Sequence, residues 1–228
     1  QALKEVLQRI PADAHPMDVM RTGCSFLGNL EPEMDFSEQM AASNRLLAAF
    51  PAIMVYWYRF THEGVEIDCN TDEDSIGGHF LKLLTGDSPS EKHRKVMDVS
   101  LILYAEHEFN ASTFTARVCA STLSDMHSCV TGAIGSLRGP LHGGANEAAM
   151  ELIEKFSTAE EATAGILGML ERKDKIMGFG HAIYRTSDPR NVIIKKWAEK
   201  LATEVGDTVL YPVSCAVEKV MWDEKELF

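Results

Sequence analysis

Apolar residues recur at helical spacing over most of the chain. Between residues 36 and 60 the period is close to 3.6, at Phe36, Met40, Leu47, Phe50, Met54 and Tyr58. Pro51 lies inside this stretch, and we expect it to kink the helix or divide it in two. No alternating Val and Ile segments separated by turn signals are present. The pattern therefore predicts an all-α fold.

Further helices are predicted wherever apolar and charged positions alternate at the same period. They cover residues 90–104, 112–137, 146–156, 158–171, 189–204 and 212–219. The 112–137 stretch is rich in small residues, which let helix backbones approach closely, so we expect it in a buried helix–helix seam. The 62–78 stretch is polar and acidic, and we expect a solvated loop there.

Composition and charge narrow the classes of function. A chain of 228 residues, 45% of them hydrophobic, can bury a large core as one domain or as a domain plus a smaller lobe. A net charge of −12 argues against a general nucleic-acid binder, although a basic site for one anionic ligand remains possible. No apolar run approaches the roughly 18–20 residues that a membrane span needs, so we expect no membrane partner.

The five cysteines are odd in number, scattered and without CxxC spacing: Cys24, Cys69, Cys119, Cys129 and Cys215. This distribution is typical of buried thiols in a reducing compartment such as the cytoplasm, and it predicts neither a disulfide framework nor a metal site. The chain begins at Gln1 without a Met and stops at Phe228, so both ends look cut. A targeting segment would therefore not be visible.

The first candidate for chemistry is the turn Gly-Pro-Leu-His-Gly-Gly-Ala-Asn-Glu at residues 139–147. Its Gly and Pro residues bring backbone close to whatever binds there. His142 stands just before a helix N-terminus, where the helix dipole disfavours the imidazolium form. A neutral histidine of this kind can donate a hydrogen bond to a carbonyl oxygen and stabilise an enol. Alternatively, His142 caps the helix and the glycines only turn the chain.

The second candidate is Gly-Phe-Gly-His-Ala-Ile-Tyr-Arg-Thr-Ser-Asp-Pro-Arg at residues 178–190. His181 can act as a general acid, and Arg185 and Arg190 can hold carboxylate or phosphate in fork geometry. Asp188 and the proline after it predict a helix start, with the aspartate at the N-cap. The alternative is a tight turn followed by a salt-bridged surface helix. The segment lacks the third glycine and the preceding strand of a dinucleotide fingerprint.

The third candidate is Tyr-Ala-Glu-His-Glu-Phe-Asn-Ala-Ser at residues 104–112. The two glutamates beside His107 cannot face one point with it on a helix, which argues against a metal site. A lone histidine at a helix junction is commonly a satisfied polar residue. We interpret the remaining histidines as structural or solvated: His15, His62, His79, His93 and His127.

Together and in this order, the three segments resemble the citrate synthase family, and the similarity extends over most of the chain from His-Pro-Met-Asp-Val-Met-Arg at residues 15–21 onward. The resemblance implies an all-α, citrate synthase-like fold in which a large helical domain and a smaller helical domain close over the active site. We place the large domain at residues 1–141 and the small domain at 142–228, with the C-terminal remainder of the large domain absent. It also implies a homodimer or a higher even oligomer whose sites borrow from both subunits.

The resemblance further implies roles for single residues. His142 would hold the thioester carbonyl of the acyl-CoA and stabilise its enol, and His181 would bind and protonate the ketone of oxaloacetate. His107 and Arg190 would grip oxaloacetate carboxylates, while Arg185 would lie near the phosphates of CoA. Five residues would lie along CoA: Lys175, Ile176, Met177, Gly178 and Phe179. No cofactor and no metal are expected beyond the CoA thioester substrate.

The chain departs from the family pattern at the catalytic base. In the family it is an aspartate that would fall beyond Phe228, and Asp223 lacks the surrounding motif, so we do not assign it. Further C-terminal arginines of the oxaloacetate site, one of them from the partner subunit, are also missing. We therefore expect the 228-residue polypeptide alone to be inactive, in contrast to its parent protein.

Within the family, segments 177–185 and 15–22 are most similar to bacterial members of the branch that makes 2-methylcitrate from propionyl-CoA and oxaloacetate, an acyltransferase reaction of propionate catabolism. The first alternative is the citrate synthase of the tricarboxylic acid cycle, which uses acetyl-CoA. One methylene separates the two substrates, worth only about 1–3 kcal/mol in an apolar pocket. More distant alternatives are a non-catalytic helical scaffold and the citryl-CoA-cleaving module of ATP-citrate lyase.

Overall fold

The computed structural model describes residues 1–181, 184 and 186–227 of the chain. Every regular element in this described part is a helix, which confirms the predicted all-α class. The chain divides into two compact units, Gln1–Gly139 and Pro140–Phe228. The sequence placed a domain boundary between residues 141 and 142, and the identification of the units with a large and a small domain stays a prediction. None of the described helices combines the length and apolar character required to cross a bilayer.

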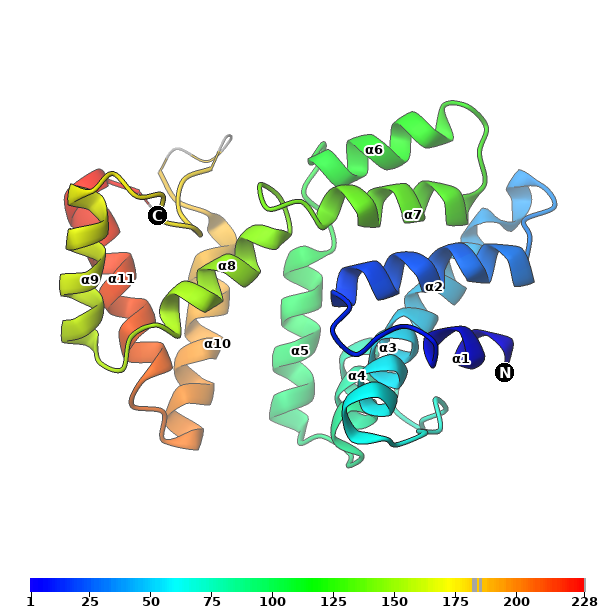
Figure 1. Cartoon of the computed structure of the whole chain (residues 1–228), viewed down its shortest axis with the longest axis horizontal. Coiled ribbons are helices and arrows are strands. Elements are labelled where there is room, and N and C mark those ends of the chain that lie inside the picture. Colours follow the sequence, from blue (N-terminus) through cyan, green and yellow to red (C-terminus); the bar gives the residue numbers. More distant parts are fainter. Residues whose placement is uncertain (182–183, 185, 228) are drawn as a thin grey trace. The chain divides into compact units, whose positions relative to one another are not determined.

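Unit 1 is a layered set of helices in which α2 packs against both α3 and α7, and α6 pairs with α7 (Figure 1). Its elements are α1 (Ala2–Leu7), α2 (Pro16–Leu30), the 3₁₀ turn η1 (Phe36–Glu38), α3 (Gln39–Glu63), α4 (Ile76–Thr85), α5 (Glu91–Tyr104), α6 (Ala111–Ala120) and α7 (Met126–Leu137). The core is built from large side chains of α3, above all Tyr56 and Trp57, against Val19 and Cys24 of α2. Aromatic side chains bury large apolar areas and therefore contribute strongly to the stability of a core.

Helix α3 runs through Pro51 without interruption, so Pro51 does not divide the helix, and the alternative expectation of a kink stays a prediction. The face that it buries agrees only in part with the apolar series noted in the sequence, of which Phe50 and Met54 pack against the core. Met40 and Leu47 of that series are 72% and 53% exposed, whereas Leu46 and Trp57 are 3% and 2% exposed. Both sets of positions lie at helical spacing, and the elements that pack on α3, chiefly α4 and α2, decide which set is covered.

The small-residue stretch 112–137 forms two helices, not one. The chain reverses between α6 and α7 in a turn where Leu123 has φ of +64°. The two helices then pack against each other along their length. A Cβ built on Gly132 would lie 3.5 Å from a methyl group of Thr115, so this glycine faces α6. The predicted seam of small residues therefore lies inside this helical hairpin.

The acidic stretch 62–78 is shorter as a loop than predicted, because α4 begins at Ile76 with Ser75 as its N-cap. The side chain of Glu73 is only 5% exposed and forms an ion pair with Arg94 on α5, with 2.9 Å between carboxylate and guanidinium. The prediction of a fully solvated loop is therefore wrong for Glu73. A buried carboxylate is tolerated where a guanidinium meets it directly.

In unit 2, α11 packs against the three other helices (Figure 1). The elements are α8 (Gly144–Ile153), α9 (Ala159–Glu171), α10 (Pro189–Val205) and α11 (Leu210–Lys225). The core contains Ile166 of α9, Val213 of α11 and Ile176 of the connection between α9 and α10. Helix α10 begins at Pro189 after the N-cap Asp188, which confirms the predicted start. Helix α11 extends further in both directions than the predicted 212–219.

Candidate active site

The glycine-rich turn before α10 is anchored in unit 2 by Ile176, which is 7% exposed in the core. Gly178 and Gly180 have φ of +97° and +79°, a region of backbone conformation that side chains disfavour. A Cβ on Gly178 would lie 3.0 Å from the Cβ of Ala149, so the turn presses directly on α8. The turn therefore requires glycine at these positions, and it presents His181 at the surface.

His181 is exposed, and its ring is oriented by Tyr184. The backbone N–H of Tyr184 donates a hydrogen bond to Nδ1 of His181, with 3.3 Å between the nitrogens. The two rings lie with centroids 4.7 Å apart and planes inclined by 31°. Because Nδ1 accepts a hydrogen bond, the neutral ring carries its proton on Nε2. His181 therefore presents an N–H donor, as a general acid toward a carbonyl oxygen requires.

Arg190 lies in the first turn of α10 and is held by Asp188. Nε of Arg190 donates to both carboxylate oxygens at 3.0 and 3.1 Å, and Nη2 donates to Oδ2 at 2.6 Å. This guanidinium lowers the pKa of Asp188, with smaller contributions from the backbone N–H of Arg190 and the nearby His181. The guanidinium carbon also lies 5.9 Å from the centre of the Tyr184 ring. His181, Tyr184, Asp188 and Arg190 are therefore neighbours in one polar cluster.

His142 lies in the turn immediately before α8 and is half-buried. Its carbonyl oxygen accepts a hydrogen bond from the backbone N–H of Ala145 at 3.1 Å, which starts the helix. The residue at the N-cap position is Gly143, so His142 precedes the cap instead of occupying it. His142 and His181 belong to the same unit, and α8 supports the turns that carry both.

His107 lies in unit 1, in the connection between α5 and α6, and is half-buried. The connection ends at Asn110, the N-cap of α6, whose side-chain oxygen accepts hydrogen bonds from the backbone of Thr113 at 2.9 Å and the hydroxyl of Ser112 at 2.7 Å. The segment Asn-Ala-Ser-Thr therefore builds a helix start beside the histidine. The structure places His107 in a different unit from the other candidate residues, and its role stays a prediction.

Comparison with known proteins identifies the family of this chain. Residues 1–228 match the family model described as citrate synthase, C-terminal domain. The chain belongs to the citrate synthase family. It is 74% identical over 228 residues to the 2-methylcitrate synthase of Shewanella oneidensis, covering 100% of this chain and 61% of that protein. It is 40% identical over 221 residues to the citrate synthase of Deinococcus radiodurans, covering 96% of this chain and 58% of that protein.

Solved structures of the family have the same fold. The citrate synthase of Thermotoga maritima matches with a TM-score of 0.81 and 32% identity, covering 98% of this chain and 59% of that one. A citrate synthase of Thermoplasma acidophilum, in ternary complex with carboxymethyl coenzyme A and oxaloacetate, matches with a TM-score of 0.89 and 25% identity, covering 100% and 61%. The chain therefore spans about three fifths of the length of the relatives that it matches.

The side chains of the residues predicted to lie along CoA differ in exposure, and therefore in their ability to contact a ligand. Lys175 is exposed and Met177 is half-buried, but the side chains of Ile176 and Phe179 pack in the core of unit 2. Contacts from Ile176 to a ligand would therefore have to come from its backbone. Arg185, predicted near the phosphates, lies outside the described residues.

Sequence reasoning missed an open cavity in unit 1. It has a volume of about 420 Å³ and is lined by residues of α2, α3, α4, α7 and the loop before α4, among them Arg45, His79 and His127. Burial lowers the pKa of His79, which favours its neutral form. No local motif could have identified the cavity, because its residues are far apart in the chain. Among the described residues, no three His, Cys, Asp or Glu side chains converge to hold a metal ion.

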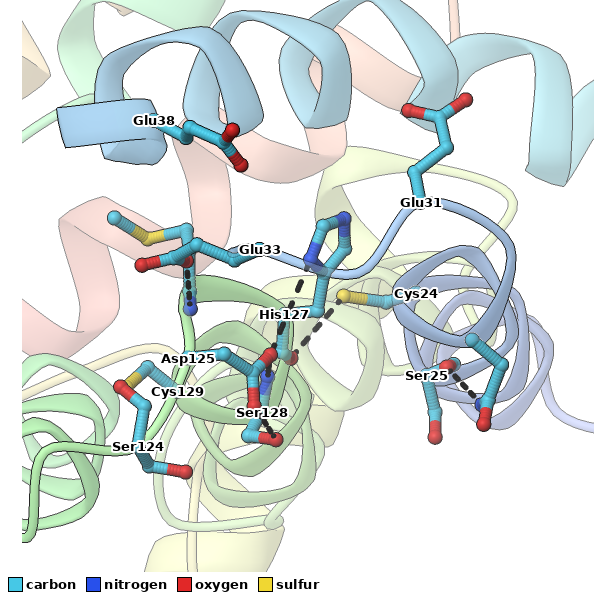
Figure 2. Close-up of polar contacts among 12 residues, drawn as sticks. Cys24, Ser25, Glu31, Glu33, Glu38, Ser124, Asp125, His127, Ser128 and Cys129 are labelled. Atoms are coloured by element: carbon cyan, nitrogen blue, oxygen red, sulfur yellow. Dashed lines mark hydrogen bonds and ion pairs between the residues drawn. The ribbon is translucent and has the colours of Figure 1, made fainter. Parts of the chain in front are cut away.

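His127 on the wall of this cavity is an integral part of the packing. Its side chain is only 4% exposed, and Nδ1 lies 4.0 Å from a carboxylate oxygen of Asp125. Figure 2 shows the ring among Glu31, Glu33 and Glu38, close to the start of α7. A Cβ on Gly28 of α2 would lie 2.8 Å from the Cβ of His127. His127 therefore fixes α7 against α2, and this position agrees with the structural role expected for it.

The five cysteines are free thiols. Burial raises the pKa of Cys24. Burial, together with a hydrogen bond to Cys119, raises the pKa of Cys129 to about 11. Thiolates are the reactive form of cysteine, so neither buried residue is suited to act as a nucleophile at neutral pH.

Proposed function

We propose that the full-length protein is a 2-methylcitrate synthase, which condenses propionyl-CoA and oxaloacetate, with water, to 2-methylcitrate and CoA. It would act as an acyltransferase that converts the acyl group into an alkyl group on transfer. The observation that carries this proposal is the 74% identity, over all 228 residues, to the Shewanella oneidensis protein of that name. A cytoplasmic location and a place in propionate catabolism would follow from it.

The two histidine turns suit the two ends of a Claisen-type condensation. A base removes a proton from the α-carbon of the thioester, and His142 would donate a hydrogen bond to the thioester oxygen as the enol forms. The enol carbon then attacks the ketone carbon of oxaloacetate, and Nε2–H of His181 would give its proton to the ketone oxygen. Hydrolysis of the resulting thioester by water releases CoA. Preorganised donors of this kind stabilise the charge that develops in the transition state.

The remaining predicted residues would bind the substrates. Arg190 and His107 would hold carboxylates of oxaloacetate, and the 175–179 segment with Arg185 would lie along CoA. The base is not assigned to any of the 228 residues. Both substrates are anionic while the chain has a net charge of −12, so local cations must attract them.

We further infer a homodimer, or a higher even oligomer, with α6 at the contact. Phe114 and Val118 on this helix are 60% and 51% exposed, and Phe109 and Leu123 at its two ends are 68% and 74% exposed. Clustered apolar side chains of this size are typical of surfaces that pack against another protein. The active site of the dimer would include residues of both subunits.

Acetyl-CoA is the alternative substrate. The relatives from Deinococcus radiodurans and Heyndrickxia coagulans, 40% and 41% identical, carry the name citrate synthase. A Bacillus subtilis relative at 40% identity carries the name citrate/2-methylcitrate synthase. One methylene contributes only about 1–3 kcal/mol to discrimination, so turnover of both thioesters is expected.

The test is the release of CoA by the full-length protein with oxaloacetate and either thioester. We expect a higher kcat/KM for propionyl-CoA, with activity lost in His142→Ala and His181→Ala. His93→Ala, a change at an exposed histidine of α5, is the matched control and should leave activity unchanged. A strong acetyl preference would identify a citrate synthase of the tricarboxylic acid cycle. Absence of activity with any short acyl-CoA would refute the proposed function.

A further inference from the structure

Asp188 makes two different sets of contacts at the start of α10. As the N-cap, its Oδ1 accepts a hydrogen bond from the backbone N–H of Arg190 at 2.9 Å. The same carboxylate receives three further hydrogen bonds from the guanidinium of Arg190, two from Nε and one from Nη2. Capping of the helix requires only the first of these bonds, which an uncharged N-cap residue could also accept. The other three fix the direction in which the guanidinium points.

The contact between Asp188 and Arg190 is built within one turn of chain. Only Pro189 separates the two residues, and its ring fixes φ at the first helical position. The side chain of Arg190 is 30% exposed and that of Asp188 is 22% exposed, so the pair is partly shielded from water. Tyr184 covers a further side, because its ring lies beside both His181 and the guanidinium. Arg190 is therefore constrained before any substrate arrives.

We propose that Asp188 is a positioning residue of the oxaloacetate site, an inference that rests on the proposed function. It engages Nε and Nη2 of Arg190, and the orientation that these bonds impose would present the guanidinium to a substrate carboxylate. A side chain as long as arginine loses considerable rotamer freedom when it binds a ligand, and a partner that orients it in advance reduces that loss. Tyr184 supports this arrangement by linking the orientation of Arg190 to that of His181.

Asp188 has two opposing effects on the binding of oxaloacetate, and the KM for oxaloacetate shows which effect is larger. Its negative charge repels an anionic substrate and partly neutralises Arg190, which would weaken oxaloacetate binding. Its hydrogen bonds orient the guanidinium, which would strengthen binding. If the charge effect dominated, neutralising Asp188 would lower the KM for oxaloacetate. If positioning dominates, as we propose, the same change raises it.

Asp188→Asn in the full-length protein separates capping from positioning. Asparagine is as good an N-cap as aspartate, so the helix start is retained, but its amide accepts fewer and weaker hydrogen bonds from the guanidinium. We expect the KM for oxaloacetate to rise roughly tenfold while the KM for propionyl-CoA changes less than about twofold. Asp188→Ser, which also caps, should behave in the same way. Asp188→Ala should raise the KM similarly and in addition lower the thermal midpoint.

Failure of the positioning role of Asp188 and failure of the proposed function would give different experimental results. Turnover by the wild-type protein tests the proposed function before any variant is made. Given turnover, an unchanged or lower KM for oxaloacetate in both Asp188→Asn and Asp188→Ser would overturn the positioning role. An equal rise in both KM values would also overturn it, because that pattern indicates general damage to unit 2. If Asp188→Asn does not fold, Asp188→Ser carries the comparison.

Discussion

The backbone N–H of Tyr184 points at Nδ1 of His181 and donates a hydrogen bond to it across 3.3 Å. This bond spans three residues of the glycine-rich turn and decides which nitrogen of the imidazole is an acceptor. The proton of the neutral ring is thereby placed on Nε2. The chemistry proposed for His181 thus depends on a backbone group as much as on its own side chain.

This relationship predicts the tautomer of His181. In the neutral ring, the nitrogen chemical shifts should show Nε2 protonated and Nδ1 unprotonated. Nitrogen-15 NMR of the histidine-labelled 228-residue chain at alkaline pH measures this directly. His181→Asn identifies the resonance by its disappearance, and His93 serves as an exposed comparison. A proton on Nδ1 of His181 would contradict the hydrogen bond and the donor role inferred from it.

Gly178→Ala should distort the turn that carries His181. The substitution forces alanine to a φ of +97° and places its Cβ 3.0 Å from that of Ala149. The left-handed conformation alone costs about 1–2 kcal/mol. We expect at least that loss in the free energy of unfolding in urea, with CoA release lowered roughly tenfold or more because His181 is displaced.

Gly168→Ala is the matched control. Gly168 lies inside α9, and its new Cβ would meet only the flexible end of Arg172 at 3.4 Å. Removing a glycine from a helix interior should stabilise unit 2 by about 0.5–1 kcal/mol without affecting turnover. Equal stability of the two variants would show that the turn tolerates a side chain at residue 178.

Those parts of the fold that depend on local chemistry could be predicted from the sequence. The starts of α9 and α10 follow from the caps Thr158 and Asp188, because an N-cap acts within three residues. Features that depend on distant partners could not be predicted. The exposed face of α3 and the burial of Glu73 are decided by helices elsewhere in unit 1, and the reversal at Leu123 carries no glycine to mark it.

In the candidate site, too, some features follow from local sequence and others depend on contacts that the sequence does not show. Its glycine turns were recognisable because glycine permits the positive φ that Gly178 and Gly180 adopt. The contact between Asp188 and Arg190 was missed although both residues were singled out, since a cap and a binding cation were considered separately. A carboxylate two residues before an arginine at a helix start is a local signal that could have revealed it. The position of His127 required the packing of α7 on α2.

Phe114→Ser should weaken self-association of the full-length protein. Phe114 is 60% exposed on α6, so its loss costs little packing within the chain but removes apolar area from the inferred contact. Sedimentation velocity should show a shift toward a smaller species on dilution. Val192→Ser is the matched control, since Val192 is 72% exposed on α10 and lies outside the inferred contact.

An unchanged sedimentation profile for Phe114→Ser would contradict the placement of α6 at the contact. A shift shared by Val192→Ser would contradict it as well, because it would indicate that any loss of exposed apolar area has the same effect.

The N-cap Asp125 should make unit 1 sensitive to acid. Oδ1 of Asp125 accepts a hydrogen bond from the backbone N–H of Ser128 at 3.0 Å, and Oδ2 accepts one from its hydroxyl at 2.6 Å. The hydroxyl bond, with the backbone bond and the nearby His127, lowers the pKa of Asp125. The unfolded state therefore binds a proton at higher pH than the folded state does. Stability from this group is complete above the ordinary value of about 3.9 and is lost as the pH falls through the lower folded value.

Asp125→Ala and Asp125→Asn test this dependence. At pH 7 the alanine variant should be less stable in urea by about 1 kcal/mol because the cap is lost, while the asparagine variant should remain close to wild type. At about pH 3 and below, the difference between wild type and the alanine variant should shrink, since protonation removes the advantage of the carboxylate. The asparagine variant should keep its margin over alanine at both pH values, because its amide does not titrate. A difference between wild type and Asp125→Ala that stays constant from pH 7 to pH 3 would show that the charge of Asp125 does not contribute to stability.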